Sequence, residues 1–167
     1  ILFCSVEFDT EDLEKAIDEA FSDVLVVGCT TAGELTPMGY MHGTLAGISL
    51  AGPCFEAEAA YIHDLENYTL TAGHAIVSDV IKGLNSRSIA ETEDNTFAFL
   101  MIDGLCQCEE SVVGSLYSCL GSIPLFGGSA GDDLAFERTF VLHDGRFCSD
   151  SAVLTLIRTH HPFKVFN

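Results

Sequence analysis

Residues 125–133 read Leu-Phe-Gly-Gly-Ser-Ala-Gly-Asp-Asp, an apolar pair followed by three glycines within five positions and then two acids. Glycine tolerates positive φ angles and lets the backbone approach another chain or a ligand closely. This composition therefore predicts a buried strand that ends in a glycine-rich turn carrying acidic side chains. The candidate ligand-binding residues in this segment are Gly127, Gly128, Ser129, Ala130, Gly131, Asp132 and Asp133.

An earlier stretch, residues 26–34, repeats this pattern with one extra residue. Gly28 corresponds to Gly127, and Glu34 corresponds to Asp132. The two stretches therefore predict two related strand ends, each followed by a small polar turn. The candidate ligand-binding residues of the earlier stretch are Gly28, Cys29, Thr30, Thr31 and Glu34.

The similarity extends beyond these turns, because residues 46–50 correspond to residues 152–156. Signals for a strand, a helix, a strand, a loop and further strands occur twice, in approximate repeats at 1–62 and 96–158. Apolar positions at helical spacing predict a bridging helix over about 68–84. We therefore expect one domain of α/β class, with mixed α+β character. An internal duplication would give it two similar lobes, with helices packed on mixed sheets.

Local signals define several elements. First-turn acids and apolar residues at i, i+3, i+4 and i+7 predict a helix over 11–21 capped by Asp9 or Thr10. A second helix is expected over 109–120. Asp144-Gly145 is a type I′ hairpin signal.

The expected strands follow from apolar runs and alternation. We expect residues 44–50 and 55–62 to form an antiparallel hairpin, and residues 36–42 to form a loop. The remaining expected strands are 1–8, 24–27, 97–102, 123–126, 138–143, 146–148 and 152–158.

The charge and hydropathy of the chain exclude several function classes. Seven basic residues against 25 acidic ones give a formal charge of -18, which repels nucleic acid and anionic lipid surfaces. No apolar run approaches the roughly 20 residues that span a bilayer, and the first residues lack signal-peptide features. We expect a cytoplasmic protein that binds neither nucleic acid nor membrane. The absence of an initiator Met predicts a fragment of a longer chain.

The seven cysteines are odd in number and lie mostly within apolar runs. This pattern indicates reduced, buried thiols rather than a disulfide framework. Cys106 and Cys108 form a CxC pair, but no second pair follows at zinc spacing, and structural zinc requires four converging ligands. We therefore expect no metal site.

Four segments together resemble the N-terminal region of FIST-domain proteins: Val27–Glu34, Ile102–Leu105, Pro124–Asp133 and the hairpin at His143–Gly145. The resemblance covers nearly the whole chain, and residues 161–163 resemble the segment leading into a C-terminal FIST part that is absent here. It implies an intracellular sensory module of a signal-transduction protein that binds a small ligand such as an amino acid. The implied signalling partner is a histidine kinase, a diguanylate cyclase or a chemoreceptor.

The chemistry of the two glycine segments fits amino-acid recognition if the segments face each other across a cleft. Backbone N–H groups freed by the glycines would receive a carboxylate, and the acids would hold an ammonium group. The hydroxyl residues would orient the ligand. Asp103, an acid at a strand end, either enters the same cleft or caps its own turn. The glycines also fit a purely structural role in reversing a strand.

Three alternatives remain open. Glu34, Asp132 and Asp133 would form a general acid/base cluster, or Cys29 a nucleophile, in an enzyme, but no triad order, HExxH, P-loop or zinc quartet is present, so we expect no catalytic residues. A haem-binding nitric-oxide sensor is implied by the resemblance to some members, with His42 as the best local axial ligand; otherwise no cofactor is expected. The third alternative is a dimerisation or docking surface.

Overall fold

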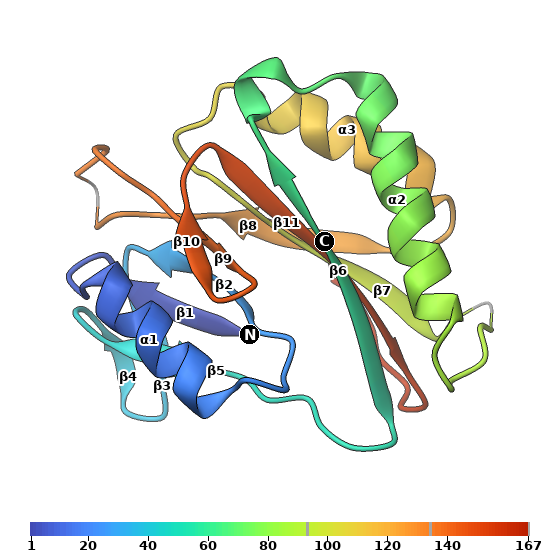
Figure 1. Cartoon of the computed structure of the whole chain (residues 1–167), viewed down its shortest axis with the longest axis horizontal. Coiled ribbons are helices and arrows are strands. Elements are labelled where there is room, and N and C mark those ends of the chain that lie inside the picture. Colours follow the sequence, from blue (N-terminus) through green and yellow to red (C-terminus); the bar gives the residue numbers. More distant parts are fainter. Residues whose placement is uncertain (93, 134, 167) are drawn as a thin grey trace.

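Two β-sheets form the centre of the fold (Figure 1). The computed structural model of the protein describes residues 1–92, 94–133 and 135–166. The strands of the two sheets are β1 (Leu2–Ser5), β2 (Val27–Thr31), β5 (Leu45–Gly47), β6 (Phe55–His63), β7 (Thr96–Ile102), β8 (Leu125–Ser129), β9 (Val141–His143), β10 (Arg146–Cys148) and β11 (Ser151–Thr159). The five-stranded sheet has the order β10-β9-β2-β1-β5, and the four-stranded sheet has the order β6-β11-β7-β8.

The four-stranded sheet is built around β11, whose nine residues are all buried. β11 pairs antiparallel with β6 on one side and with β7 on the other. Because side chains alternate across a strand, Leu154 and Leu156 face the helices α2 (Leu70–Asn85) and α3 (Glu109–Leu120), whereas Val153 faces the five-stranded sheet. The two helices therefore cover one face of this sheet, as Figure 1 shows, and the five-stranded sheet covers the other.

Helix α1 (Thr10–Ala20) covers the outer face of the five-stranded sheet, where Ile17 packs with Val26 and Leu142. The Asp9 side chain accepts a hydrogen bond from the Asp12 amide at 3.1 Å and caps the helix. The predicted helix and its Asp9 cap are therefore confirmed. The layers follow the order α1, five-stranded sheet, four-stranded sheet, and α2 with α3, which confirms the mixed α/β class.

Two further local predictions are confirmed. Helix α3 occupies Glu109–Leu120, the range predicted from the sequence. Asp144 and Gly145 have φ angles of 49° and 71°, as a type I′ turn requires, and they join β9 to β10.

The expected hairpin between residues 44–50 and 55–62 is wrong. β5 pairs with β1, whereas β6 pairs with β11 along nine residues, so the two strands belong to different sheets. The long partner β11 offers β6 more backbone hydrogen bonds than the three-residue β5 does, and the connection at residues 51–54 crosses between the sheets.

The loop expected over 36–42 is also wrong, because β3 (Glu34–Thr36) and β4 (Gly39–Met41) pair antiparallel. The Thr36 hydroxyl donates to the Gly39 carbonyl oxygen at 3.0 Å, and Gly39 has a φ angle of 108°. A side-chain hydrogen bond and a left-handed glycine thus close a tight hairpin in a segment with little apolar alternation.

Gly28 and Gly127 lie within strands, so the prediction that they begin turns is wrong. Neither has a positive φ angle. An added Cβ atom would instead lie 2.4 Å from the Leu2 carbonyl oxygen at Gly28, and 1.8 Å from the Leu100 carbonyl oxygen at Gly127. Each glycine therefore allows the neighbouring parallel strand to come close, which explains why the two segments share this residue.

We expect Gly127→Ala to lower the free energy of unfolding by about 1–3 kcal/mol, because its Cβ would overlap the Leu100 carbonyl group and push β8 from β7. Gly128→Ala is a matched control, since its added Cβ meets no atom within 4 Å. Its effect should stay within about 0.5 kcal/mol. Urea denaturation measures both variants. Equal losses in the two variants would mean that the close approach of β7 is not what requires glycine at position 127.

The two halves of the sequence use the same strand order. β1 pairs parallel with β2 and antiparallel with β5, and β7 pairs parallel with β8 and antiparallel with β11. The halves also exchange strands, because β9 joins β2 and β6 joins β11. This shared order is compatible with an internal duplication. The duplication itself, with repeats at 1–62 and 96–158, stays a prediction.

Candidate functional site

The two glycine segments meet at the carboxyl ends of β2 and β8. The Gly131 amide donates a hydrogen bond to the Thr30 carbonyl oxygen at 2.9 Å, and a Cβ atom added to Gly131 would lie 3.0 Å from the Ala32 nitrogen. The Thr30 hydroxyl accepts a hydrogen bond from the Phe140 amide at 3.0 Å. The segments are therefore neighbours, as the ligand hypothesis requires, but at these residues they touch through their backbones rather than across a cleft.

Asp132 holds the loop that follows β8. Its carboxylate accepts hydrogen bonds from the amides of Phe136 at 2.9 Å, Glu137 at 2.6 Å and Arg138 at 3.0 Å. Burial alone would raise the pKa of Asp132, but these backbone hydrogen bonds outweigh burial and hold the pKa below its ordinary value. The Asp132 carboxylate is therefore ionised, and its oxygens bind the amides of the loop that follows it.

Asp103 plays a similar part after β7. Its buried carboxylate accepts hydrogen bonds from the amides of Leu105 at 2.9 Å and Asp150 at 2.5 Å, and from the Thr139 hydroxyl. The turn-capping role weighed for this acid is therefore present, and it extends to two segments distant in sequence. Asp103 ties the ends of β7 and β11 to the segment before β9.

Glu34 is the third buried acid of the predicted set. It accepts a hydrogen bond from the Thr31 hydroxyl at 2.5 Å, and both the amide and the hydroxyl of Thr44 donate to its other oxygen. All three acids thus have hydrogen-bond donors from the chain itself. An incoming ammonium group would compete with these donors for the same oxygens.

The remaining predicted residues divide between interior and surface. Cys29 and Ala130 are buried between the sheets, and burial, reinforced by the charge of Cys4, raises the pKa of the Cys29 thiol to about 12. Ser129 and Asp133 lie at the surface: the Ser129 hydroxyl donates to Glu109 at 3.0 Å, and Asp133 lies 3.1 Å from the His42 Nδ1 atom. Because its pKa is raised, the Cys29 thiol is protonated near neutral pH, which disfavours a role for Cys29 as a nucleophile.

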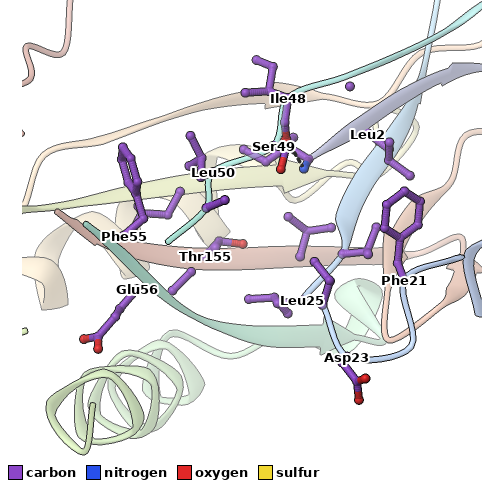
Figure 2. Close-up of a pocket in the computed structure, with 18 of the residues that line it drawn as sticks. Leu2, Phe21, Asp23, Leu25, Ile48, Ser49, Leu50, Phe55, Glu56 and Thr155 are labelled. Atoms are coloured by element: carbon purple, nitrogen blue, oxygen red, sulfur yellow. Dashed lines mark hydrogen bonds between the residues drawn. The ribbon is translucent and has the colours of Figure 1, made fainter. Parts of the chain in front are cut away.

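A cavity of about 720 Å³ opens between the sheets near the amino ends of β1 and β2, away from the glycine segments (Figure 2). Its walls come from residues 21–27, 47–51 and 55–57, together with Thr155 and Ile157 of β11. The walls are mostly aliphatic and aromatic. None of the residues proposed from the sequence lines this cavity. Its volume is within the range of about 300–1,000 Å³ typical of small-molecule sites.

Thr155 places a polar atom in the cavity wall. Alternation along β11 directs Thr155, like Val153 and Ile157, toward the five-stranded sheet. Among the residues that the structure describes, its hydroxyl is the buried side-chain polar atom that lacks a hydrogen-bond partner. Figure 2 shows this hydroxyl pointing into the space between the surrounding side chains. A ligand group that hydrogen-bonds there would relieve the cost of burying it.

Two of the charged side chains at the cavity, Arg87 and Glu56, are already engaged, and the third, Asp23, is exposed and points away from the space in Figure 2. Arg87 donates to Glu58 Oε2 through Nη2 at 2.6 Å and through Nε at 3.2 Å. Glu56 accepts hydrogen bonds from the amides of Ser88 at 2.7 Å and Ile89 at 2.8 Å. The cavity therefore presents a largely apolar wall with the buried, unpaired Thr155 hydroxyl, rather than a cation and an anion that are both free to bind a ligand.

Haem does not fit this cavity, because its lining contains no His, Cys, Met or Tyr side chain to serve as an axial ligand. His42, the candidate from the sequence, lies elsewhere, on a half-exposed edge with its ring 4.9 Å from the Tyr40 ring and its Nδ1 atom near Asp133. In the described ranges, no three His, Cys, Asp or Glu side chains are grouped to hold a metal ion.

Sequence reasoning missed the cavity because residues 24–27 and 48–50 read as ordinary apolar strand segments. In the structure Val24 and Ile48 lie outside the strands, with 60% and 58% of their surface exposed. One signal was available: Ser49 and Thr155 occupy corresponding positions in the two similar stretches, and both line the cavity.

We expect Thr155→Val to raise the free energy of unfolding by about 1 kcal/mol, because valine keeps the shape and removes an unpaired buried hydroxyl. Thr159→Val is the matched control. Thr159 is equally buried on the same strand, but its hydroxyl accepts a hydrogen bond from the His161 amide at 3.0 Å, so its replacement should destabilise. Chemical denaturation measures both. A loss of stability in Thr155→Val would show that its hydroxyl is satisfied.

The family model described as the FIST N domain matches residues 1–167, the whole chain. A search of curated proteins found no match. Among the described residues, no helix has the length and apolar character needed to cross a bilayer.

Proposed function

The chain belongs to the FIST N domain family, a family of sensory domains, and from this premise we propose that it binds a small molecule in the inter-sheet cavity as the sensor of a signal-transduction protein. The observation that carries this proposal is the unpaired, buried Thr155 hydroxyl in the wall of a ligand-sized cavity. Its signalling partner is proposed to be of the kind that the resemblance implies, a histidine kinase, a diguanylate cyclase or a chemoreceptor.

The position of the cavity suits a conformational signal. Its walls join β11, an interior strand of one sheet, to the segments 21–27 and 47–51, which lead into β2 and out of β5 of the other. A ligand that contacts both sheets favours the relative arrangement of the sheets to which it binds more tightly. The shift in population between two arrangements is set by the difference in the ligand's affinity for them. A binding role rather than catalysis is favoured by Glu34 and Asp132 of the glycine segments, whose oxygens accept hydrogen bonds from hydroxyl and backbone donors of the chain.

A thermal-shift screen tests the proposal, with amino acids, small carboxylates, neutral aromatic compounds and haem as the compounds. A ligand at 100 times its dissociation constant adds about 2.7 kcal/mol, which raises the melting temperature of a domain of this size by several degrees. We expect Ala57→Phe, which places a phenyl ring in the cavity beside Thr155, to abolish the shift. Ala75→Phe carries the same substitution to an exposed position on α2 and should retain the shift.

Two results would contradict the proposal. A shift that survives Ala57→Phe but disappears in Ser129→Ala would place the ligand at the glycine segments instead. Conversion of the bound compound into a product, lost in Asp132→Asn, would favour the enzyme alternative.

A further inference from the structure

We infer that the ligand is a neutral, largely apolar molecule carrying one hydroxyl or carbonyl group, which hydrogen-bonds to Thr155. This inference rests on the proposed ligand cavity and names the chemical class that the cavity selects. It departs from the amino acid that the family resemblance implies. Three features of the cavity lead to it: the composition of its walls, the state of its charged groups, and the buried Thr155 hydroxyl that lacks a partner among the described residues.

The walls select an apolar body. Phe21, Val24 and Leu25 come from the connection between α1 and β2. Leu50 comes from the connection between the two sheets, and Phe55 is the first residue of β6. Figure 2 shows Phe21, Leu25, Leu50 and Phe55 arranged around a common space. Each is at least partly exposed, so a ligand that covers them removes apolar surface from water, with a gain that grows with the buried area.

The charged groups disfavour an ionic ligand. A zwitterionic amino acid needs both a cation and an anion as partners. The cation Arg87 is already paired with Glu58, and the Glu56 oxygens accept two backbone amides. Asp23 also lines the cavity, but it is exposed and offers an anion without a free cation beside it. A ligand carboxylate would either displace the Arg87 pair or enter the apolar space without a counter-ion, which is strongly unfavourable. The formal charge of -18 further reduces the local concentration of anions.

The Thr155 hydroxyl supplies specificity for one polar group. A threonine hydroxyl both donates and accepts a hydrogen bond, so it pairs with a ligand hydroxyl or carbonyl group. Because the hydroxyl has no partner among the described residues, a ligand that lacks such a group leaves it unpaired, whereas a matching ligand satisfies it. Pairing of this kind discriminates between otherwise similar ligands by about tenfold in dissociation constant.

Four probes of similar size test this inference: 4-ethylphenol, ethylbenzene, 4-ethylbenzoate and phenylalanine. Dissociation constants are measured by NMR titration of the folded chain. We expect 4-ethylphenol to bind about tenfold more tightly than ethylbenzene, and both to bind more tightly than the two charged probes. Thr155→Val should remove the difference between the first two probes, whereas Thr155→Ser, which keeps a hydroxyl, should preserve it.

The outcomes separate the ligand class from the cavity itself. If 4-ethylbenzoate or phenylalanine binds most tightly and Ala57→Phe abolishes that binding, the cavity is the site and the inferred class is wrong. If the native protein and Thr155→Val show the same ratio of dissociation constants for 4-ethylphenol and ethylbenzene, Thr155 does not hydrogen-bond to the polar group of the ligand. If every probe binds Ala57→Phe as well as the native protein, or none binds at all, the cavity is not the ligand site and the proposed function falls with it.

Discussion

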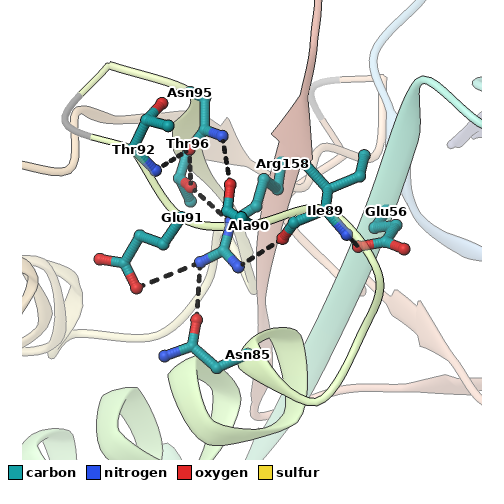
Figure 3. A network of polar contacts seen from close by, with 9 residues as sticks. All are labelled: Glu56, Asn85, Ile89, Ala90, Glu91, Thr92, Asn95, Thr96 and Arg158. Carbon is teal, nitrogen blue, oxygen red and sulfur yellow. Dashed lines mark hydrogen bonds and ion pairs between the residues drawn. The ribbon is translucent and has the colours of Figure 1, made fainter.

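Replacing Arg158 with alanine is expected to lower the free energy of unfolding by about 3–5 kcal/mol, the range for removing one partner of a buried charge network. The guanidinium group is buried and donates hydrogen bonds to Asn85 at 2.8 Å, to the Ile89 carbonyl oxygen at 3.2 Å and to Thr96 at 3.1 Å (Figure 3). Glu91 lies 3.4 Å away as its counter-ion. One side chain of β11 therefore joins the end of α2, the following connection and β7.

Two variants test this interpretation by chemical denaturation. Arg87→Ala removes a partly exposed ion pair with Glu58, and we expect a loss of only about 0–1 kcal/mol. Arg158→Lys keeps the charge, but a single ammonium group cannot reach all of the acceptors that the planar fork reaches, so it should recover only part of the loss. Hydrogen exchange should accelerate in residues 86–92 of the Arg158 variants. If Arg158→Ala costs no more than Arg87→Ala, the network does not hold this connection.

Features that depend on neighbouring residues could be predicted from the sequence. The Asp9 cap of α1 involves the amide of Asp12, and the type I′ turn requires only that Asp144 and Gly145 adopt positive φ angles. Both are decided within a few residues, where side-chain hydrogen bonding and glycine geometry act directly. The α/β class follows from the same local periodicities.

Strand partners could not be predicted in this way. β6 finds its partner β11 about ninety residues later, and the alternating apolar pattern of β6 is equally compatible with β5 as a neighbour. The sequence predicts turns at Gly28 and Gly127 because glycine is typical of turns. It does not show that each glycine lies against a carbonyl oxygen of the neighbouring strand. The carbonyl groups of Leu2 and Leu100 supply the reason for each glycine, and both belong to strands well separated from it.

The roles of the acids divide in the same manner. Asp132 receives its donors from residues four to six positions ahead, a local arrangement that resembles an extended turn cap. Asp103 receives two of its donors from Thr139 and Asp150, which only the tertiary fold brings near. Thr155 is the opposite case, because its importance comes from a missing partner, and sequence alone does not show which hydroxyls lack one.

The second large effect is expected from Asp132→Asn, which should lower the free energy of unfolding by about 2–4 kcal/mol at neutral pH. The carboxylate accepts three backbone amides, whereas an asparagine side chain has one acceptor oxygen and turns an NH₂ group toward the remaining donors. The loop over 136–138 would lose its anchor, and with it the approach of the chain to β9.

This effect should depend on pH, because the pKa of Asp132 in the folded protein is held below its ordinary value of 3.8. Above about pH 5 the carboxylate is ionised in both the folded and the unfolded state, and its full contribution to stability is present. That contribution is lost as the pH falls through the folded-state pKa. The difference in unfolding free energy between the native protein and Asp132→Asn should therefore be constant from pH 5 to 7 and shrink toward pH 3.

Asp133→Asn is the matched control, since it changes the adjacent acid in the same way. Asp133 is half-exposed and lies beside His42 at the surface, so its replacement should cost less than about 1 kcal/mol.

Ligand binding supplies the decisive second measurement. If Asp132 serves only to anchor the loop, Asp132→Asn that remains folded should keep its affinity for the cavity ligand. A variant of unchanged stability that no longer binds would instead place Asp132 at the ligand and return the site to the glycine segments.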